Sequence, residues 1–187
     1  MIIRKATSAD LAGICAVADS VRLDTEQIQE SGFLVYVLDK QAYADRLDES
    51  DLFLVAIDQD EVVGFILCYE DHTVANLVRR GVLSSDLLRA RELAGCNGRW
   101  LYGDQIAVRP AYVRRGIGPA LVLALYNEIK HRGIDSVFVG ILHEPLNTAS
   151  KAFCEGLGFA FRGTLRYEDG RLWGIYCREV PQERDKS

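Results

Sequence analysis

The second half of the chain alternates between strand-like and helix-like hydrophobic patterns. Strand-like runs cover Trp100–Val108 and Ser136–Leu142, and helix-like runs cover Pro119–His131 and Asn147–Leu157. Strands that alternate with helices are typical of layered folds, because each helix buries an apolar face against a sheet. The sequence therefore predicts an α/β fold, an α+β sandwich built on one mixed sheet.

The first half adds a strand, helices and a hairpin to this plan. Thr7 and Asp10 form a helix start signal, in which Thr7 caps the helix and Asp10 reaches back to the cap. Two β-rich runs separated by Asp58–Glu61 predict an antiparallel hairpin. The expected elements are a strand at Ile2–Lys5, a helix from Leu11 to Val21, a helix at Gln41–Leu47, and strands at Leu52–Ile57 and Val62–Tyr69.

A polar, helix-favouring segment at about residues 72–97 interrupts this order. Its spaced apolar residues predict one or two amphipathic helices, so we interpret it as an insertion. A last hairpin is expected from Phe159–Tyr167 and Arg171–Cys177. With no internal repeat and no linker, the sequence predicts a single domain at residues 1–180, followed by a flexible tail at 181–187.

Bulk composition excludes several classes of protein. The 187 residues are 49% hydrophobic and 26% charged, which argues against a disordered or fibrous chain. A net charge of -5 disfavours nucleic-acid binding, which needs clustered Lys and Arg. No apolar run approaches the roughly 20 residues of a membrane span. Five cysteines without a C-x-x-C pair and no signal-peptide pattern predict a reduced, cytoplasmic protein, and the three scattered histidines indicate no metal site.

The segment that indicates chemistry is the loop at residues 113–118, between a strand and a buried helix. The first amides of a helix have no internal partner and lie at the positive end of its dipole, so they attract anions. Gly116 and Gly118 let a phosphate approach the backbone closely. Pro119 gives up an amide that lacks a helical partner, while Arg114 and Arg115 add positive charge. Alternatively, the glycines only make a tight turn.

Two motifs together resemble the GNAT superfamily of acyl-CoA N-acyltransferases. The first is V-R-P at residues 108–110 followed by V-R-R-G-I-G at 113–118, similar to the family's V-x-P and Q/R-x-x-G-x-G/A. The second is N-T-A-S-K-A-F-C-E-G-L-G-F at 147–159, which looks like N-x-x-A-x-x-F-Y-x-x-x-G-F. The resemblance covers essentially the whole chain apart from the insertion. It implies a mixed, mostly antiparallel sheet with a splayed strand pair and helices on both faces.

The resemblance also implies a binding site for acetyl-CoA or another acyl-CoA. The pyrophosphate is expected on the amides of residues 113 to 118, and the pantetheine arm between the strands Trp100–Val108 and Ser136–Leu142. Asn147 and Phe153 are expected near the cofactor; their alternatives are a helix N-cap and a core residue. The expected cofactor-binding residues are Ile106, Ala107, Val108, Val113, Arg114, Arg115, Gly116, Ile117, Gly118, Pro119, Asn147 and Phe153.

The chain departs from the family pattern at two positions. Val113 stands where the family has Gln or Arg, so charge would come from its arginine neighbours. Cys154 stands where the family usually has the Tyr that protonates the departing CoA thiolate. A thiol can donate a proton, since its reference pKa is about 8.5, but a Cys among apolar helical neighbours is more often a packing residue.

The acceptor amine must lose a proton, which requires a base. Asp104, on the strand beside the expected thioester, is the first candidate, and Glu70 at the end of an earlier strand run is another. Asp71, His143 and Glu144 are further candidates, and each could instead be a solvated charge.

The sequence therefore predicts an acetyl-CoA-dependent N-acetyltransferase in which a primary amine of a small molecule or peptide attacks the thioester directly. Two alternatives stay open: a catalytically weak GNAT-like CoA-binding or sensing module, and an interaction protein that uses the 72–97 insertion. The identity of the amine is not encoded in a recognisable motif. Dimers are common in the family, and a homodimer is an open expectation.

Overall fold

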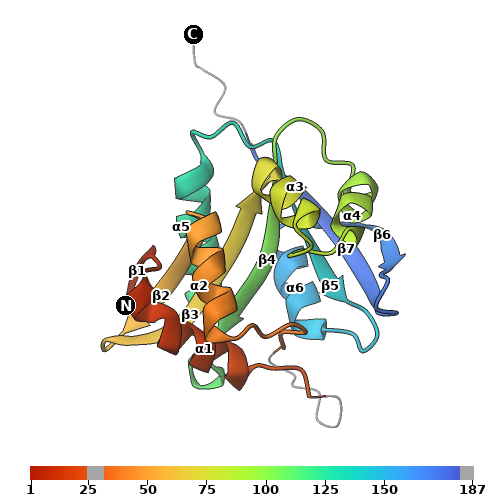
Figure 1. Cartoon of the computed structure of the whole chain (residues 1–187). Helices are drawn as coiled ribbons and strands as arrows, with labels where there is room; N and C mark the ends of the chain where they lie inside the picture. The colour runs from red at the N-terminus through yellow and green to blue at the C-terminus, as the bar shows by residue number, and fades with distance from the viewer. Residues whose placement is uncertain (25–31, 182–187) are drawn as a thin grey trace. The chain divides into compact units, whose positions relative to one another are not determined.

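The computed structural model describes residues 1–24 and 32–181 (Figure 1). The chain divides into two compact units. The first unit comprises Met1–Cys68 and Asp104–Asn127, and the second comprises Tyr69–Gly103 and the chain from Glu128 onward. A single domain at 1–180 stays a prediction, and the tail expected at 181–187 lies outside the described residues apart from its first residue.

The first unit contains an antiparallel set of three strands, which Figure 1 shows side by side. They are β1 (Ile2–Lys5), β2 (Phe53–Asp58) and β3 (Glu61–Glu70). Ile2 pairs with Ile57 and Phe53 with Leu67, which confirms the predicted hairpin. The β2–β3 register shifts between Ala56 and Ile57, because β3 carries an extra residue at this point, a β-bulge.

The first two helices of this unit begin within one residue of their predicted starts. A 3-10 turn (Ser8–Asp10) leads into α1 (Leu11–Ser20), and α2 spans Lys40–Glu49. The Asp10 carboxylate accepts a 2.8 Å hydrogen bond from the Thr7 amide, so it reaches back as expected. Asp39 caps α2 by accepting from the Ala42 amide at 2.8 Å. Both caps satisfy amides that the helix itself leaves unpaired.

Helices cover both faces of the sheet within the first unit. On one face, the Tyr43 ring of α2 packs against Phe53 and Phe65, with ring centroids 6.2 and 5.9 Å apart. On the other face, a Cβ at Gly64 would lie 3.3 Å from Ile117, the first residue of α5 (Ile117–Ile129). Neighbouring strand residues such as 64 and 65 point to opposite faces. The expected two-sided arrangement is therefore confirmed here.

The second unit holds the parallel strand pair. The first part of β4 (Trp100–Val108) runs parallel to β5 (Ser136–Leu142), with pairs from Trp100–Ser136 to Gly103–Val139. β5 pairs antiparallel with β7 (Leu172–Glu179), which pairs antiparallel with β6 (Ala160–Arg166). The hydrogen-bonded strand order is β1-β2-β3-β4-β5-β7-β6. The predicted mixed, mostly antiparallel sheet is confirmed.

The segment at 72–97 forms two helices, as its pattern predicts. These are α3 (Asp71–Arg79) and α4 (Asp86–Ala94), and Figure 1 shows α4 beside β6 and β7. The buried Asp86 carboxylate accepts a 2.8 Å hydrogen bond from the Glu168 amide. Glu168 belongs to the β6–β7 hairpin turn, so α4 is anchored to that hairpin.

Two helix boundaries differ from the prediction. α5 starts at Ile117, two residues before the expected Pro119, and ends at Ile129. Proline is compatible with the first turn of a helix, because the amide that it lacks would have no partner there. α6 spans Thr148–Gly156, close to the expected 147–157. Among the described residues, no helix is both long enough and apolar enough to cross a membrane.

Candidate cofactor loop and catalytic residues

The expected pyrophosphate loop lies in the first unit, between the end of β4 and the start of α5. The Arg109 amide donates to the Val63 carbonyl at 2.9 Å, which fixes the end of β4 to β3. The Arg109 guanidinium also pairs with Glu61 at 3.1 Å. A 3-10 turn at Pro110–Tyr112 then leads into the loop. The loop is therefore held at both ends, by the strand pairing and by the buried start of α5.

The backbone of this loop has the shape of an anion-binding nest. Arg114 and Gly116 have positive φ angles of 65° and 79°, and turns that include left-handed residues can direct successive amides to one side. In the described part of the chain, the amides of residues 114 to 116 donate to no backbone carbonyl. The Val113 amide instead donates to the Pro110 carbonyl at 3.3 Å. The candidate cradle is thus residues 114–118, one residue shorter than expected.

Open space and positive charge surround the cradle. No atom of the chain lies within 4 Å of the position that a Cβ at Gly116 would occupy. Arg114 and Arg115 are exposed, and the Arg115 guanidinium lies 4.7 Å from the centre of the Tyr112 ring, a cation–π contact. The loop can therefore receive an anion without moving a side chain out of the way at Gly116.

Strand β4 places the remaining first-unit candidates just before the loop. Ile106 and Val108 are half-buried, and Ala107 is buried. A Cβ at Gly64 would lie 2.9 Å from the Ala107 carbonyl oxygen, so only glycine allows β3 to approach β4 this closely. Asp104 is half-buried in the same strand.

The negative charge of Asp104 contributes to the raised pKa values of two buried groups in its own unit. Burial, and after it the negative charge of Asp104, raises the pKa of the Cys68 thiol. Burial also raises the pKa of Tyr43, with Asp104 again contributing. Both groups stay protonated at neutral pH. Asp104 therefore lies in the same unit as the loop, and its charge acts on two neutral groups of that unit.

One polar link in this unit has no counterpart in the sequence-based site. The Tyr43 hydroxyl donates to Gln105 Oε1 at 2.9 Å, and Gln105 Nε2 donates to the Tyr36 carbonyl at 2.8 Å. Gln105 is buried, so this pairing satisfies an amide that would otherwise be costly to bury. The link ties the chain at Tyr36, and α2 through Tyr43, to strand β4. The feature of the sequence that could have indicated this link is a Gln within an otherwise apolar strand pattern.

In the second unit, α6 carries Asn147 as its cap. The Asn147 side chain accepts from the Ser150 amide at 3.2 Å and the residue is only 5% exposed. The N-cap alternative is therefore confirmed, and a cofactor contact stays a prediction. Phe153 is half-buried on the same helix.

Cys154 has the environment of a packing residue. The residue is buried, and burial raises the pKa of its thiol to about 12. Proton transfer from such a thiol to a thiolate of ordinary pKa, about 8.5, is uphill by roughly 5 kcal/mol. The geometry therefore gives Cys154 little capacity to act as an acid.

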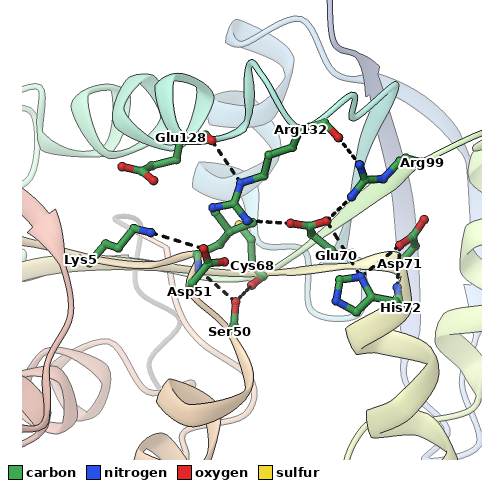
Figure 2. Close-up of polar contacts among 11 residues, drawn as sticks. Lys5, Ser50, Asp51, Cys68, Glu70, Asp71, His72, Arg99, Glu128 and Arg132 are labelled. Carbon is green, nitrogen blue, oxygen red and sulfur yellow. Dashed lines mark hydrogen bonds and ion pairs between the residues drawn. The ribbon is translucent and has the colours of Figure 1, made fainter.

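Glu70 lies in a cluster of charged groups at the end of β3, drawn in Figure 2. Its two carboxylate oxygens accept from Arg99 and Arg132, each at 2.7 Å. Arg99 also donates to the Arg132 carbonyl, and His72 Nδ1 lies 4.0 Å from the carboxylate. Glu70 is 8% exposed. Because each oxygen already has a guanidinium partner, the arrangement resembles a structural ion pair more than an available base.

A tyrosine and a histidine near α6 form a pair that the sequence reading did not connect. His143 Nε2 lies 3.2 Å from the Tyr176 hydroxyl. A Cβ at Gly174 would lie 2.1 Å from His143 Nε2, so glycine provides the space for the ring. Burial, with Lys151 adding to it, lowers the pKa of His143. Burial is also the largest cause that raises the pKa of Tyr176, and the nearby charges include Cys154.

The described part of the chain contains no group of three or more His, Cys, Asp and Glu side chains arranged to hold a metal ion.

The predicted site residues fall into two sets, one in each compact unit. Asp104, the β4 backbone and the loop share the first unit, whereas Glu70, Asn147, Phe153 and Cys154 belong to the second.

Comparison with known proteins bears on the family. A model of the acetyltransferase (GNAT) family matches residues 19–159. No curated protein gave a significant sequence match. Among solved structures, Ard1 from Thermoplasma volcanium superposes with a TM-score of 0.67 at 19% identity, covering 97% of this chain and 98% of that one.

Two further structures have the same fold. The ribosomal-protein-S18-alanine N-acetyltransferase from Escherichia coli gives a TM-score of 0.64 at 16% identity, covering 100% of this chain and 97% of that one. The protein yncA from Salmonella typhimurium, solved with its cofactor acetyl-CoA, gives 0.66 at 19% identity, covering 100% and 98%.

Proposed function

Because the chain belongs to the GNAT acetyltransferase family, we propose that it transfers an acetyl group from acetyl-CoA to a primary amine of a small molecule or peptide. The observation that carries this proposal is the loop at 114–118. Its left-handed residues, unpaired amides and exposed arginines suit a diphosphate at the start of a helix. GNAT acetyltransferases use acetyl-CoA, which contains such a group.

The loop and β4 would bind the cofactor in different ways. The amides at 114–118 would hold the pyrophosphate, and Arg114 and Arg115 would add charge. The pantetheine arm would bond to the backbone at Ile106 and Val108, as an added strand does. A backbone amide near Val108 would polarise the thioester carbonyl. These roles use only groups of the first unit.

Asp104 is the proposed base. An alkylammonium with a pKa near 10.4 is neutral in only about one molecule in a few thousand at pH 7, so the reaction needs proton removal. Asp104 can accept this proton directly or through water. Glu70 is the weaker candidate, because Arg99 and Arg132 occupy its oxygens.

The departing thiolate needs no side-chain acid, such as the family's usual Tyr, if water protonates it. Cys154 is a poor donor because of its raised pKa. We assign the proton to solvent, not to Cys154.

Peptide amino termini deserve the first test among acceptors. The E. coli structure is named for acetylating an alanine of a ribosomal protein, and its fold matches this chain along nearly its whole length. Small amines, amino acids and lysine side chains form the rest of the panel.

The test measures CoA release with a thiol reagent while acetyl-CoA is mixed with each amine. Turnover with at least one amine, and a fall of about 10²-fold or more in kcat for Asp104→Asn, is the expected result. Unchanged kcat in Asp104→Asn would exclude Asp104 as the base. Glu70→Gln serves as the comparison variant.

A second candidate, a CoA-binding module with little turnover, is favoured by one observation, the poor acidity of Cys154. It predicts calorimetric binding of acetyl-CoA together with no acetyl transfer to any amine of the panel. The two candidates therefore differ in one measurement. Absence of CoA binding would contradict both.

A further inference from the structure

Two buried thiols of the second unit face each other. Cys96 Sγ and Cys177 Sγ are 3.6 Å apart, and each residue is only 3% exposed. Cys96 follows α4, while Cys177 lies within β7 and is paired on both sides, with Phe138 of β5 and Ala160 of β6. The two residues are 81 positions apart in sequence. Their approach is therefore a product of the fold.

The two thiols differ in pKa: the hydrogen bond with Cys96, and after it burial, raise the pKa of Cys177. A hydrogen bond from the Cys177 thiol, with help from the positive charges of Arg91 and Arg162, lowers the pKa of Cys96 to about 7. Burial instead raises the pKa values of Cys68 and Cys154. Since the thiolate is the nucleophile, Cys96 is the more reactive of these thiols once a reagent reaches it.

The geometry points to a modification site: we propose that hydrogen peroxide oxidises Cys96 and Cys177 to a reversible disulfide that ties the end of α4 to β7. In the first step the Cys96 thiolate attacks the peroxide, forms a sulfenic acid and releases hydroxide. In the second step the Cys177 sulfur attacks the sulfenic sulfur and releases water. The two thiols lose two electrons and two protons, and the peroxide becomes two waters.

The fold allows the small movement that this bond requires. The sulfurs must close from 3.6 Å to about 2.05 Å. Cys177 is fixed by the strands on both sides, so the movement falls to Cys96. Cys96 lies in a turn between Gly95 and Gly98, which have positive φ angles of 71° and 66°. The turn at residues 97–99 is exposed, which gives a small oxidant a route through local opening.

The site does not depend on the acetyl-transfer reaction, so its test needs no substrate. The reduced, full-length protein is treated with hydrogen peroxide and then denatured. The expected results are a mass loss of about 2 Da for the two hydrogens, a fall from five titratable thiols to three, and a non-reduced peptide joining residues 96 and 177. The thermal midpoint should rise by about 5–10 °C, because the cross-link closes a long loop, and dithiothreitol should reverse it.

Variants separate this pair from the other thiols. Cys177→Ser should abolish the mass loss, whereas Cys15→Ser, a matched control at a half-buried thiol, should retain it. Retention of the loss in Cys177→Ser would overturn the proposal, as would five unreacted thiols or a gain of one or more oxygens at Cys96 without a cross-link. If Cys177→Ser folds poorly, the peptide map of the unaltered protein gives the answer by itself.

Discussion

At the scale of single residues, a few backbone and side-chain details decide what the loop can bind. Gly116 has a φ of 79° and open space beside it. A side chain there would therefore meet solvent or a ligand, not the rest of the protein. Arg114 adopts a left-handed conformation at a cost of about 1–2 kcal/mol. Strain of this kind in a candidate binding loop is consistent with a binding role.

Gly116→Glu should weaken CoA binding by about 10- to 100-fold, because a carboxylate would face the diphosphate. Isothermal titration calorimetry measures this change. Gly116→Ala is the matched control: it imposes the same left-handed strain without charge and should bind within a few-fold of the parent. Equal affinity of Gly116→Glu and Gly116→Ala would show that the diphosphate binds elsewhere.

Cys154→Ala should leave kcat within about twofold of the parent, since a thiol with a pKa of about 12 does not supply the proton. The variant should instead lose roughly 1 kcal/mol of unfolding free energy through the small cavity that it leaves. Steady-state kinetics and urea denaturation measure the two effects. A hundredfold fall in kcat, with CoA affinity unchanged, would restore Cys154 as the acid.

At the scale of elements, the sequence predicted the strands and helices better than the side-chain contacts between them. Strands β1, β4 and β5 have the predicted bounds, because their apolar runs are bounded by clear stop signals. The start of α5 was placed two residues late, because Pro119 looked like the first helical residue and is in fact the third.

The side-chain partners were the part that the sequence could not supply. Gln105 bonds to Tyr36 and Tyr43, and both lie far from it in sequence. His143 likewise bonds to the distant Tyr176. Periodicity reports which face a residue takes, and it does not report which residue comes to meet it. The same limit applies to Glu70, which looked like a strand-end acid until Arg99 and Arg132 were placed beside it.

Asp86 gives a test at the element scale, because it links α4 to the β6–β7 hairpin. Its carboxylate is 1% exposed and accepts from Arg89, as well as from the Glu168 amide. Asp86→Ala should lower the unfolding free energy by about 1–3 kcal/mol, since it removes the buried carboxylate that accepts from the Glu168 amide and from Arg89. Hydrogen exchange should then rise first in α4 and at the hairpin turn. Uniform exchange across the chain would contradict this anchoring role.

At the scale of the whole molecule, the two units share three elements. β3, β4 and α5 each begin in one unit and end in the other. A unit that unfolded alone would break strands and a helix that the remaining unit also needs. The covalent path of the chain therefore favours joint unfolding of the two units.

Thermal unfolding should accordingly be a single transition, with the calorimetric enthalpy equal to the van't Hoff enthalpy. Scanning calorimetry gives the first quantity and circular dichroism the second. Two resolved transitions, or a calorimetric enthalpy well above the van't Hoff value, would show that the units unfold separately.

The space left by Gly174 limits which amino-acid substitutions can occur at positions 174 and 143. The His143 imidazole occupies the volume that any side chain at 174 would need. A methyl group at 174 would therefore displace the imidazole and break its hydrogen bond to the Tyr176 hydroxyl. Any residue larger than glycine at position 174 therefore requires the His143 ring to turn away or residue 143 to become smaller, so the identities of the two positions are coupled.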